Sequence, residues 1–289
     1  MSVEVWAMVA AGIAALVVGL LLVRRRVRAA TGADKVIVLG PVFMAVALAI
    51  FAAEHFTAAR DLMGIVPKWL PGPLFWTYFV GAAWAAAAIS FVVWRYVGWS
   101  ALLTAVMLLL IVITIDLPGV PKFPHTRFFW ILTVRETCFA SGLLVLAGSL
   151  WRRSFGNVLV RVGRFVVGAT MVFYGIEHFF YPRNVSGVPL EKMTPGWIPA
   201  PVLIAYVVGM VLLVGGIALL FGRAVRESAA GAGLVLVLLV AFFYVPIFLT
   251  EMHTALAVEG MNYVGDTLMF AAAVLLAGFG PDSGTLRRV

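Results

Sequence analysis

The sequence predicts an all-α integral membrane protein, built as a tandem duplication of a four-helix transmembrane bundle plus one extra N-terminal transmembrane helix. Three observations predict this class. Of the 289 residues, 63% are hydrophobic and 12% are charged, and the mean hydropathy is +1.07, which lies outside the range of soluble domains. About nine apolar stretches reach the roughly 20 residues that a helix needs to cross a bilayer core. Two parts of the chain also resemble each other at a nearly constant spacing.

The first apolar stretch is interpreted as a retained helix. Arg24, Arg25 and Arg26 follow it instead of preceding it, and the stretch is longer than the apolar region of a secretory signal. We therefore predict an N-terminal transmembrane helix with a basic linker over 1–30, a first four-helix repeat over 31–153 and a second over 154–289. The predicted spans are 5–23, 36–53, 74–94, 99–115, 128–150, 158–176, 200–221, 230–249 and 261–279.

The distribution of basic residues predicts the orientation. Short loops rich in Lys and Arg remain in the cytoplasm, and an outside N-terminus places 14 of the 21 Lys and Arg residues on the inner face. We therefore expect the bacterial cytoplasmic membrane, with the C-terminus inside. Contact with anionic lipid accounts for the net charge of +8, and no basic patch interleaved with aromatic residues predicts nucleic-acid binding. The inner-face residues are Arg24, Arg25, Arg26, Arg28, Lys35, Arg95, Arg152, Arg153, Arg161, Arg164, Arg223, Arg226, Arg287 and Arg288.

The internal repeat is visible in short motifs. FAAEHF (51–56) and YGIEHF (174–179) each place Glu-His-Phe at the end of an apolar run, 123 residues apart. The offset then becomes 128, where PKWLPGPLFWTYFVG (67–81) and PGWIPAPVLIAYVVG (195–209) share seven of fifteen positions. The change of offset marks a five-residue insertion before Pro195. Because four is an even number of spans, both copies would cross the membrane in the same orientation.

These motifs resemble the DoxX-like family of four-helix membrane proteins. The resemblance rests on Gly-x-Glu-His-Phe at 175–179, on the Pro-x-Trp-x-Pro-x-Pro turns, and on a last helix that begins with Glu-Thr or Asp-Thr. It covers about 36–150 and 158–279, and the first copy fits less well because Ala52 and Ala53 precede its Glu. Members of the family are associated with quinone-linked sulfur oxidation, redox-enzyme maturation and membrane redox complexes. The resemblance therefore implies a redox-partner role with protein subunits and a quinone-like small molecule.

The polar residues that we expect at the outer side are the candidate site. Each half repeats a Glu-His pair, a His-Thr pair and a carboxylate on its fourth helix, and such groups accept protons near neutral pH or bind metals. Ionisable groups within membranes commonly mark a site or pathway. The proton-handling candidates are Glu54, His55, Glu177 and His178; the candidates that contact a cofactor are Phe173, Tyr174, Trp197, Tyr206, Glu136 and Asp266; the candidate metal ligands are His55, His125, His178 and His253.

Three functions are compatible with these residues. The first is a membrane subunit of a redox complex that binds quinone or quinol at the outer leaflet, with Glu-His pairs taking up protons. The second is a metal- or haem-binding protein that uses the four outer histidines. The third is a non-enzymatic scaffold or assembly subunit, or a transporter. No nucleophile elbow, P-loop, HExxH or GxGxxG motif is present, so hydrolase, NTPase and nicotinamide chemistry have no support.

The second half is predicted to carry the site. Gly175 allows a ring to approach closely, aromatic residues surround Glu177 and His178, and the insertion suggests a larger outer vestibule. The structural alternatives are an aromatic belt at the membrane interface, Glu residues that bond a neighbouring helix or an Arg, and a local salt bridge between Arg135 and Glu136. The single cysteine, Cys138, is expected to serve packing.

Overall fold

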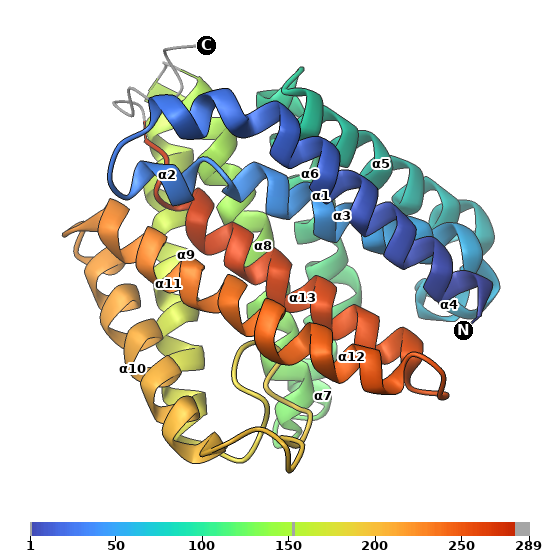
Figure 1. Ribbon diagram of the computed structural model, residues 1–289. Coiled ribbons are helices and arrows are strands. Elements are labelled where there is room, and N and C mark those ends of the chain that lie inside the picture. The colour runs from blue at the N-terminus through green and yellow to red at the C-terminus, as the bar shows by residue number, and fades with distance from the viewer. Residues whose placement is uncertain (1, 152–153, 281–289) are drawn as a thin grey trace.

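The computed structural model describes residues 2–151 and 154–280, and the regular structure of that part of the chain is helical. Figure 1 shows the helices as one bundle. The α-helices are α1 (Val3–Ala29), α2 (Asp34–Ile37), α3 (Gly40–Thr57), α4 (Ala59–Leu62), α5 (Pro73–Val93), α6 (Val97–Ile111), α7 (Gly119–Lys122), α8 (Arg127–Leu150), α9 (Ser154–Phe180), α10 (Pro201–Leu220), α11 (Val225–Leu239), α12 (Val245–Glu251) and α13 (Ala257–Leu276). The 3-10 helix η1 is Met63–Ile65, and η2 (Val112–Asp116) and η3 (Val240–Tyr244) are π-helical turns.

Eight helical segments in the described residues are long and apolar enough to cross a membrane. They correspond to the first eight predicted spans. The ninth prediction coincides with α13, whose first half carries Glu259, Asn262 and Asp266 and is therefore too polar to be counted with the others. Residues 264–276 of α13 are nevertheless all buried. This part of the helix lies inside the protein, where Asp266 pairs with Arg135 and Thr267 donates to the Val188 carbonyl.

The fourth helix of each half packs against the first helix of the other half. Helix α8 lies along α9, and α13 lies along α3, while α8 and α13 also contact each other at the centre of the molecule. At that crossing, a Cβ added to Gly142 would lie only 2.6 Å from the Ala273 Cα. Each half therefore contributes its last helix, α8 or α13, to the packing of the other half. The two halves share one hydrophobic core, which includes the buried Cys138.

The two halves share backbone features at the spacing of 128 residues seen in the sequence. The π-helical turns η2 and η3 are separated by this spacing. Three pairs of residues with positive φ are separated by it as well. This agreement supports the duplication, which stays a prediction. The pairs are Gly72 and Ala200, Trp94 and Gly222, and Tyr96 and Ala224.

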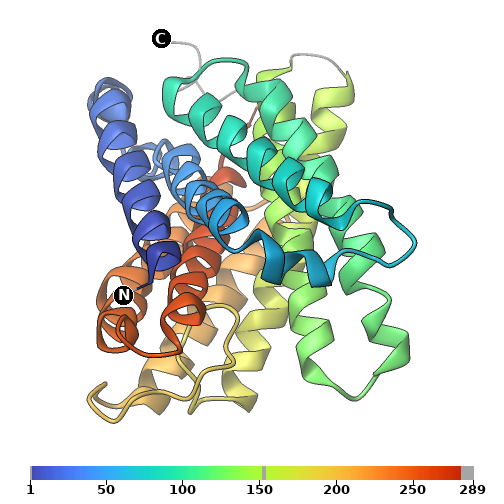
Figure 2. The same cartoon turned by 90° about the vertical axis from the view of Figure 1, so that its right-hand side faces the viewer.

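Several basic residues assigned to the inner face gather at one end of the bundle. The Arg26 guanidinium lies 3.7 Å from the centre of the Trp94 ring, Arg226 pairs with Asp34, and Arg164 donates to the carbonyl of Ala277. The described N-terminal end of α1 lies at the opposite end (Figure 2). This arrangement agrees with the predicted alternation of the spans, while the side that faces the cytoplasm stays a prediction.

Candidate ligand-binding site

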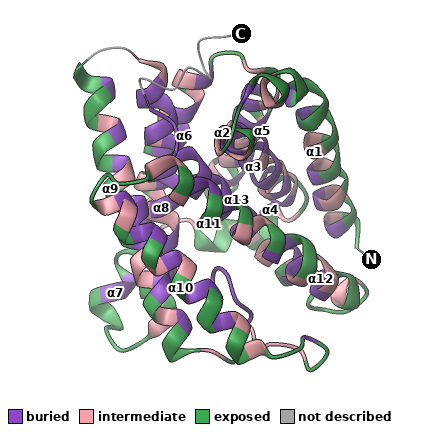
Figure 3. Cartoon of the chain, turned by 60° about the vertical axis from the view of Figure 1, so that its left-hand side comes forward, coloured by how far each residue is buried: buried purple, intermediate pink, exposed green. Residues whose placement is uncertain are grey.

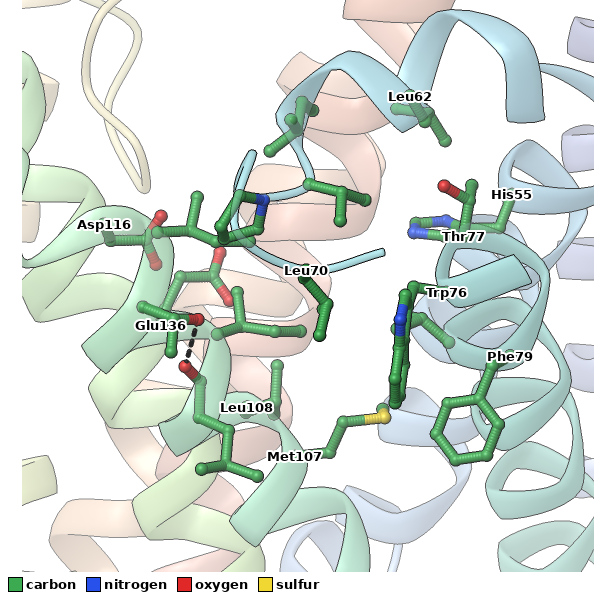
Figure 4. Close-up of a pocket in the computed structure, with 18 of the residues that line it drawn as sticks. His55, Leu62, Leu70, Trp76, Thr77, Phe79, Met107, Leu108, Asp116 and Glu136 are labelled. Atoms are coloured by element: carbon green, nitrogen blue, oxygen red, sulfur yellow. Dashed lines mark hydrogen bonds between the residues drawn. The ribbon is translucent and has the colours of Figure 1, made fainter. Parts of the chain in front are cut away.

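A cavity of about 430 Å³ lies in the first half of the protein (Figure 4). It is enclosed by α5, α6, η2 and α8, together with the end of α3 and the connection that leads into α5. The lining residues are His55, Leu62, Ile65, Val66, Pro67, Trp69, Leu70, Trp76, Thr77, Phe79, Val80, Trp84, Met107, Leu108, Leu110, Ile111, Thr114, Ile115, Asp116 and Glu136.

The proline-rich connection before α5 closes one side of the cavity. Pro67 and Pro71 cannot continue a regular helix, and Gly72 turns the chain with φ +69° before α5 begins. The Trp76 indole N–H donates to the Pro71 carbonyl over 3.0 Å, which ties the connection to the helix. Leu70, on this connection, projects toward the cavity in Figure 4.

Two carboxyl groups form one wall. The π-helical turn η2 places Asp116 at the cavity, and π-turns occur frequently at functional sites. Asp116 is only 5% exposed, and its Oδ2 atom has no hydrogen-bond partner among the described residues. Glu136 of α8 lines the same wall. A buried carboxyl oxygen without a partner is costly, which makes Asp116 a candidate ligand-binding group.

A buried arginine holds this wall in place. Arg135 contacts Glu136 over 3.1 Å and Asp266 of α13 over 2.7 Å. The Arg135–Glu136 salt bridge weighed as a structural alternative is therefore present, and it extends into the second half. Arg135 and Glu136 also act electrostatically on Asp116. The guanidinium is thus paired with two carboxyl groups, and Asp116 lies near enough to be influenced by its charge.

An imidazole and a hydroxyl face the carboxyls from the other wall, as Figure 4 shows. His55 Nδ1 lies 2.8 Å from the Phe51 carbonyl. Because a carbonyl only accepts, Nδ1 carries the hydrogen and Nε2 of the neutral ring is an acceptor. The Trp84 ring packs edge-on against His55 at 4.7 Å. The Thr77 hydroxyl donates its hydrogen to the Pro73 carbonyl over 3.0 Å, so its oxygen can act only as an acceptor toward the cavity.

The cavity opens toward the apolar outer surface. Several lining residues are also large exposed hydrophobic side chains: Ile65 is 58% exposed, Trp69 69%, Phe79 49% and Leu110 56%. In a membrane, such a surface faces lipid.

The insertion fills the corresponding region of the second half. Residues 184–193, which we call the plug, form a loop closed by an isolated bridge between Asn184 and Met193, and residues 185–190 are all buried. The loop rises toward α13 in Figure 1, and Figure 3 shows a buried stretch within it. The expectation of a larger vestibule in the second half is thus reversed, because the inserted residues fold inward.

His178 anchors the plug. Its side chain is fully buried, its Nδ1 donates to the Tyr174 carbonyl over 2.6 Å, and its Nε2 accepts the Gly187 N–H over 3.0 Å. Tyr244, at the position that corresponds to Asp116, donates its hydroxyl to the Val185 carbonyl over 3.4 Å. Both ring nitrogens of His178 are therefore occupied by the chain itself.

Side chains from other helices fix the plug further. Arg127 of α8 donates to the Leu190 carbonyl over 3.0 Å and to Glu177 over 2.6 Å. Lys192 of the plug pairs with Glu251 of α12 over 2.5 Å. Burial raises the pKa of the Glu191 carboxyl, while Arg135 and Arg127 oppose this effect. In the structure Glu177 and His178 thus bond to other parts of the chain and are not among the residues that line the first-half cavity.

The aromatic residues proposed to hold a cofactor do not meet around one space. Tyr174 is buried and donates to the Ile131 carbonyl over 2.9 Å, with Phe173 packed edge-on against its ring. Trp197 and Tyr206 lie on the exposed surface, where Tyr206 stacks on Phe179 at 5.4 Å. This separation favours the interfacial aromatic belt for the exposed pair.

The remaining predicted residues lie apart. Glu54 is buried and accepts a hydrogen bond from Asn262 of α13 over 2.9 Å, as the helix-bonding alternative expects. His125 and His253 are both exposed. Within residues 2–151 and 154–280, no group of three or more His, Cys, Asp and Glu side chains could hold a metal ion.

Asp116 is the site residue that the sequence reading missed. It follows directly after the predicted span 99–115, and it is an isolated carboxylate at the end of a long apolar run. A lone carboxylate at the end of a membrane span could have identified Asp116 as a candidate site residue. Thr77, Trp76 and Trp84 gave none, because such residues are also common in membrane helices without a ligand.

The fold and the cavity together define a class of protein. The chain is an all-α integral membrane protein with a cavity that opens at its apolar surface and has carboxyl and imidazole groups within it. A family model described as DoxX matches residues 159–246, from α9 to the start of α12, so the second half is similar to DoxX proteins there. No curated protein and no solved structure matches the chain.

Proposed function

We propose that the protein is a subunit of a redox complex in the bacterial cytoplasmic membrane and binds a quinone or quinol in the first-half cavity. One observation carries the proposal: an apolar cavity that opens at the lipid-facing surface contains an unpartnered, buried carboxyl oxygen of Asp116. A quinone or quinol matches both properties, because its apolar ring and tail suit the apolar cavity and its oxygen-containing groups can form a hydrogen bond with the Asp116 carboxyl group. The similarity to DoxX proteins agrees with this proposal.

The size and lining of the cavity suit a small ring headgroup. A volume of about 430 Å³ lies within the roughly 300–1,000 Å³ typical of small-molecule sites. Trp76 and Trp84 offer ring faces, and polar atoms lie on opposite walls. A hydrophobic tail would leave past Trp69, Phe79 and Leu110 into the bilayer.

The proposed chemistry is the oxidation of a quinol to a quinone. Two O–H bonds break, His55 Nε2 and the Asp116 carboxylate take up the two protons, and two electrons pass to a metal or flavin centre in a partner subunit. The positive charge of Arg135 stabilises the negative charges of Glu136 and Asp266 through the two ion pairs. The roles first assigned to Glu177 and His178 are not carried forward, because these residues hold the plug.

Binding to the protein in lipid nanodiscs tests the proposal. A short-chain benzoquinone and its hydroquinone are titrated, with empty nanodiscs as the background. The variant Leu70→Trp should weaken binding at least tenfold by filling the cavity. Leu203→Trp, at an exposed position in the second half, is the matched control and should bind normally. If neither probe binds the unaltered protein above the background, the proposal is wrong.

The partner is tested separately. Purification in mild detergent, followed by an absorption spectrum and identification of the co-purifying chains, should reveal a subunit with a flavin, haem or iron–sulfur centre. Isolation of the chain alone after in-membrane cross-linking would contradict the role in a complex and would leave quinone binding to be judged by the nanodisc experiment.

A further inference from the structure

We infer that the plug shows how the ligand of the first-half cavity bonds: the ligand donates a hydrogen bond to His55 Nε2, as the Gly187 N–H does to His178. The site therefore favours the reduced, hydroxyl-bearing form of its ligand over the dicarbonyl form. This inference rests on the proposed function and adds to it a preference for one redox state.

The two histidines occupy equivalent settings. Each donates its Nδ1 hydrogen to the carbonyl four residues earlier, His55 to Phe51 and His178 to Tyr174. Each also packs against a glycine of the following long helix. A Cβ built on Gly81 would lie 2.7 Å from the His55 Cβ, and one built on Gly209 would lie 2.9 Å from the His178 Cβ. The side chains therefore leave their helices in the same way and turn the same nitrogen outward.

What each histidine faces is different. His178 faces the buried plug and accepts its Gly187 N–H over 3.0 Å. The first half lacks the inserted residues, and His55 lines the cavity. In the second half, the plug thus takes the place that a ligand would take in the first-half cavity. The group that it places against the imidazole is a hydrogen-bond donor, the Gly187 N–H.

The opposite wall accommodates the second oxygen of a ring. Asp116 can accept from a hydroxyl as a carboxylate, or donate as a carboxylic acid. It therefore does not discriminate between the two redox forms by itself. Neutral His55 does, because its Nε2 only accepts and a quinone carbonyl offers no hydrogen. A hydroquinone satisfies both walls, whereas a quinone leaves the imidazole nitrogen without a partner.

The preference has a measurable redox consequence. A ligand that binds more tightly in its reduced form has a raised reduction potential when bound, and each tenfold preference corresponds to about 30 mV for a two-electron couple. We expect a preference of at least tenfold, and hence a rise of about 30 mV or more. The bound hydroquinone would then be a weaker electron donor than the free one, so the centre that accepts its electrons in the proposed function must have a correspondingly higher potential.

The test compares probes of one ring skeleton in nanodiscs at fixed pH. The probes are a short-chain benzoquinone, its hydroquinone kept reduced without oxygen, and the dimethyl ether of that hydroquinone. The hydroquinone should bind at least tenfold more tightly than the other two. If the quinone or the ether binds as tightly as the hydroquinone, the inference is wrong although the proposed function stands. If none of them binds, the proposed function itself fails.

Variants assign the preference to a residue. His55→Phe keeps an aromatic ring beside Trp84 but removes the acceptor, so hydroquinone affinity should fall about tenfold to that of the quinone, with quinone affinity unchanged. Tyr206→Phe removes an exposed hydroxyl outside the cavity and should preserve the preference. A preference that survives in His55→Phe would overturn the assignment. The probe comparison on the unaltered protein decides the inference even if His55→Phe does not fold.

Discussion

Arg135 of α8 forms an ion pair with Asp266 of α13 over 2.7 Å at the centre of the molecule, and both residues are buried. The same guanidinium contacts Glu136 over 3.1 Å on the cavity wall. One cation therefore ties the second half of the chain to the candidate site in the first half. Several predictions depend on this connection and on the plug.

Removing the cation should strongly destabilise the protein. Arg135→Met leaves Glu136 and Asp266 buried without their partner, and breaking a buried pair costs about 3–5 kcal/mol. The double variant Arg135→Met with Asp266→Leu should recover part of this loss, because it removes one of the uncompensated carboxyls. Unfolding by a denaturing detergent measures both, with the exposed Arg60→Met as the control. Equal stability of Arg135→Met and the unaltered protein would contradict the role of the pair.

The crossing of α8 and α13 should not tolerate a side chain. A Cβ at Gly142 meets the Ala273 backbone at 2.6 Å, so Gly142→Leu forces the helices apart and should cost about 1–3 kcal/mol or more. Gly231 lies within α11 with open space around it. Gly231→Ala should be neutral or gain up to about 1 kcal/mol from helix propensity. Thermal unfolding of the two variants compares them directly.

Loss of the His178 acceptor should loosen the plug. In His178→Phe the Gly187 N–H loses its partner, and a buried unsatisfied donor costs about 1–3 kcal/mol. The backbone amides of residues 185–188 and of Leu190 should then exchange their hydrogens roughly ten- to a hundredfold faster. The exposed His125→Ala is the control. Unchanged exchange in His178→Phe would show that Arg127 and Lys192 hold the plug without the imidazole.

The plug should also respond to pH through Glu191. Burial is the largest influence on this carboxyl and raises its pKa above the ordinary value of 4.5. A raised pKa in the folded state means that the stabilising effect is complete below about pH 4.5 and is lost as the pH rises through the folded value. After correction for the intrinsic rise of amide exchange with pH, hydrogen exchange in the plug should therefore speed up over that range. Glu191→Gln should remove this change, and a variant that kept it would point to another group.

The orientation is tested with reporters. The predicted topology places the basic end of the bundle and the C-terminus in the cytoplasm. A reporter that is active only in the cytoplasm should therefore be active when it is fused after Val289. A periplasmic reporter inserted after Gly64, in the exposed turn η1, should be active in the opposite compartment. A C-terminal reporter found outside the cell would reverse the predicted topology.

Much of the fold could be predicted because membrane helices are encoded locally. Length and hydropathy gave eight of the spans, and the ninth stretch is helical but interior. The spacing of 128 residues between the repeated motifs recurs between η2 and η3, two π-helical turns that were not predicted from the sequence. The resemblance to DoxX proteins also holds over residues 159–246. The candidate site could be predicted only in part: His55 and Glu136 line the cavity, whereas Glu177 and His178 do not.

By itself, the sequence determined the membrane setting, the helices and the polar positions, because these follow from side-chain hydrophobicity along each segment. Only the tertiary structure decided which half is open. The insertion could have enlarged a vestibule, but Gly187 bonds to His178 and Val188 accepts from Thr267 of α13, so the inserted chain fills its own half. The tertiary structure likewise decided that Asp116 faces a cavity without a partner, while Asp266 is paired with Arg135. These contacts join residues 9 positions apart for Gly187 and His178, 79 for Val188 and Thr267, and 131 for Arg135 and Asp266. The hydrophobicity along a single segment does not encode them.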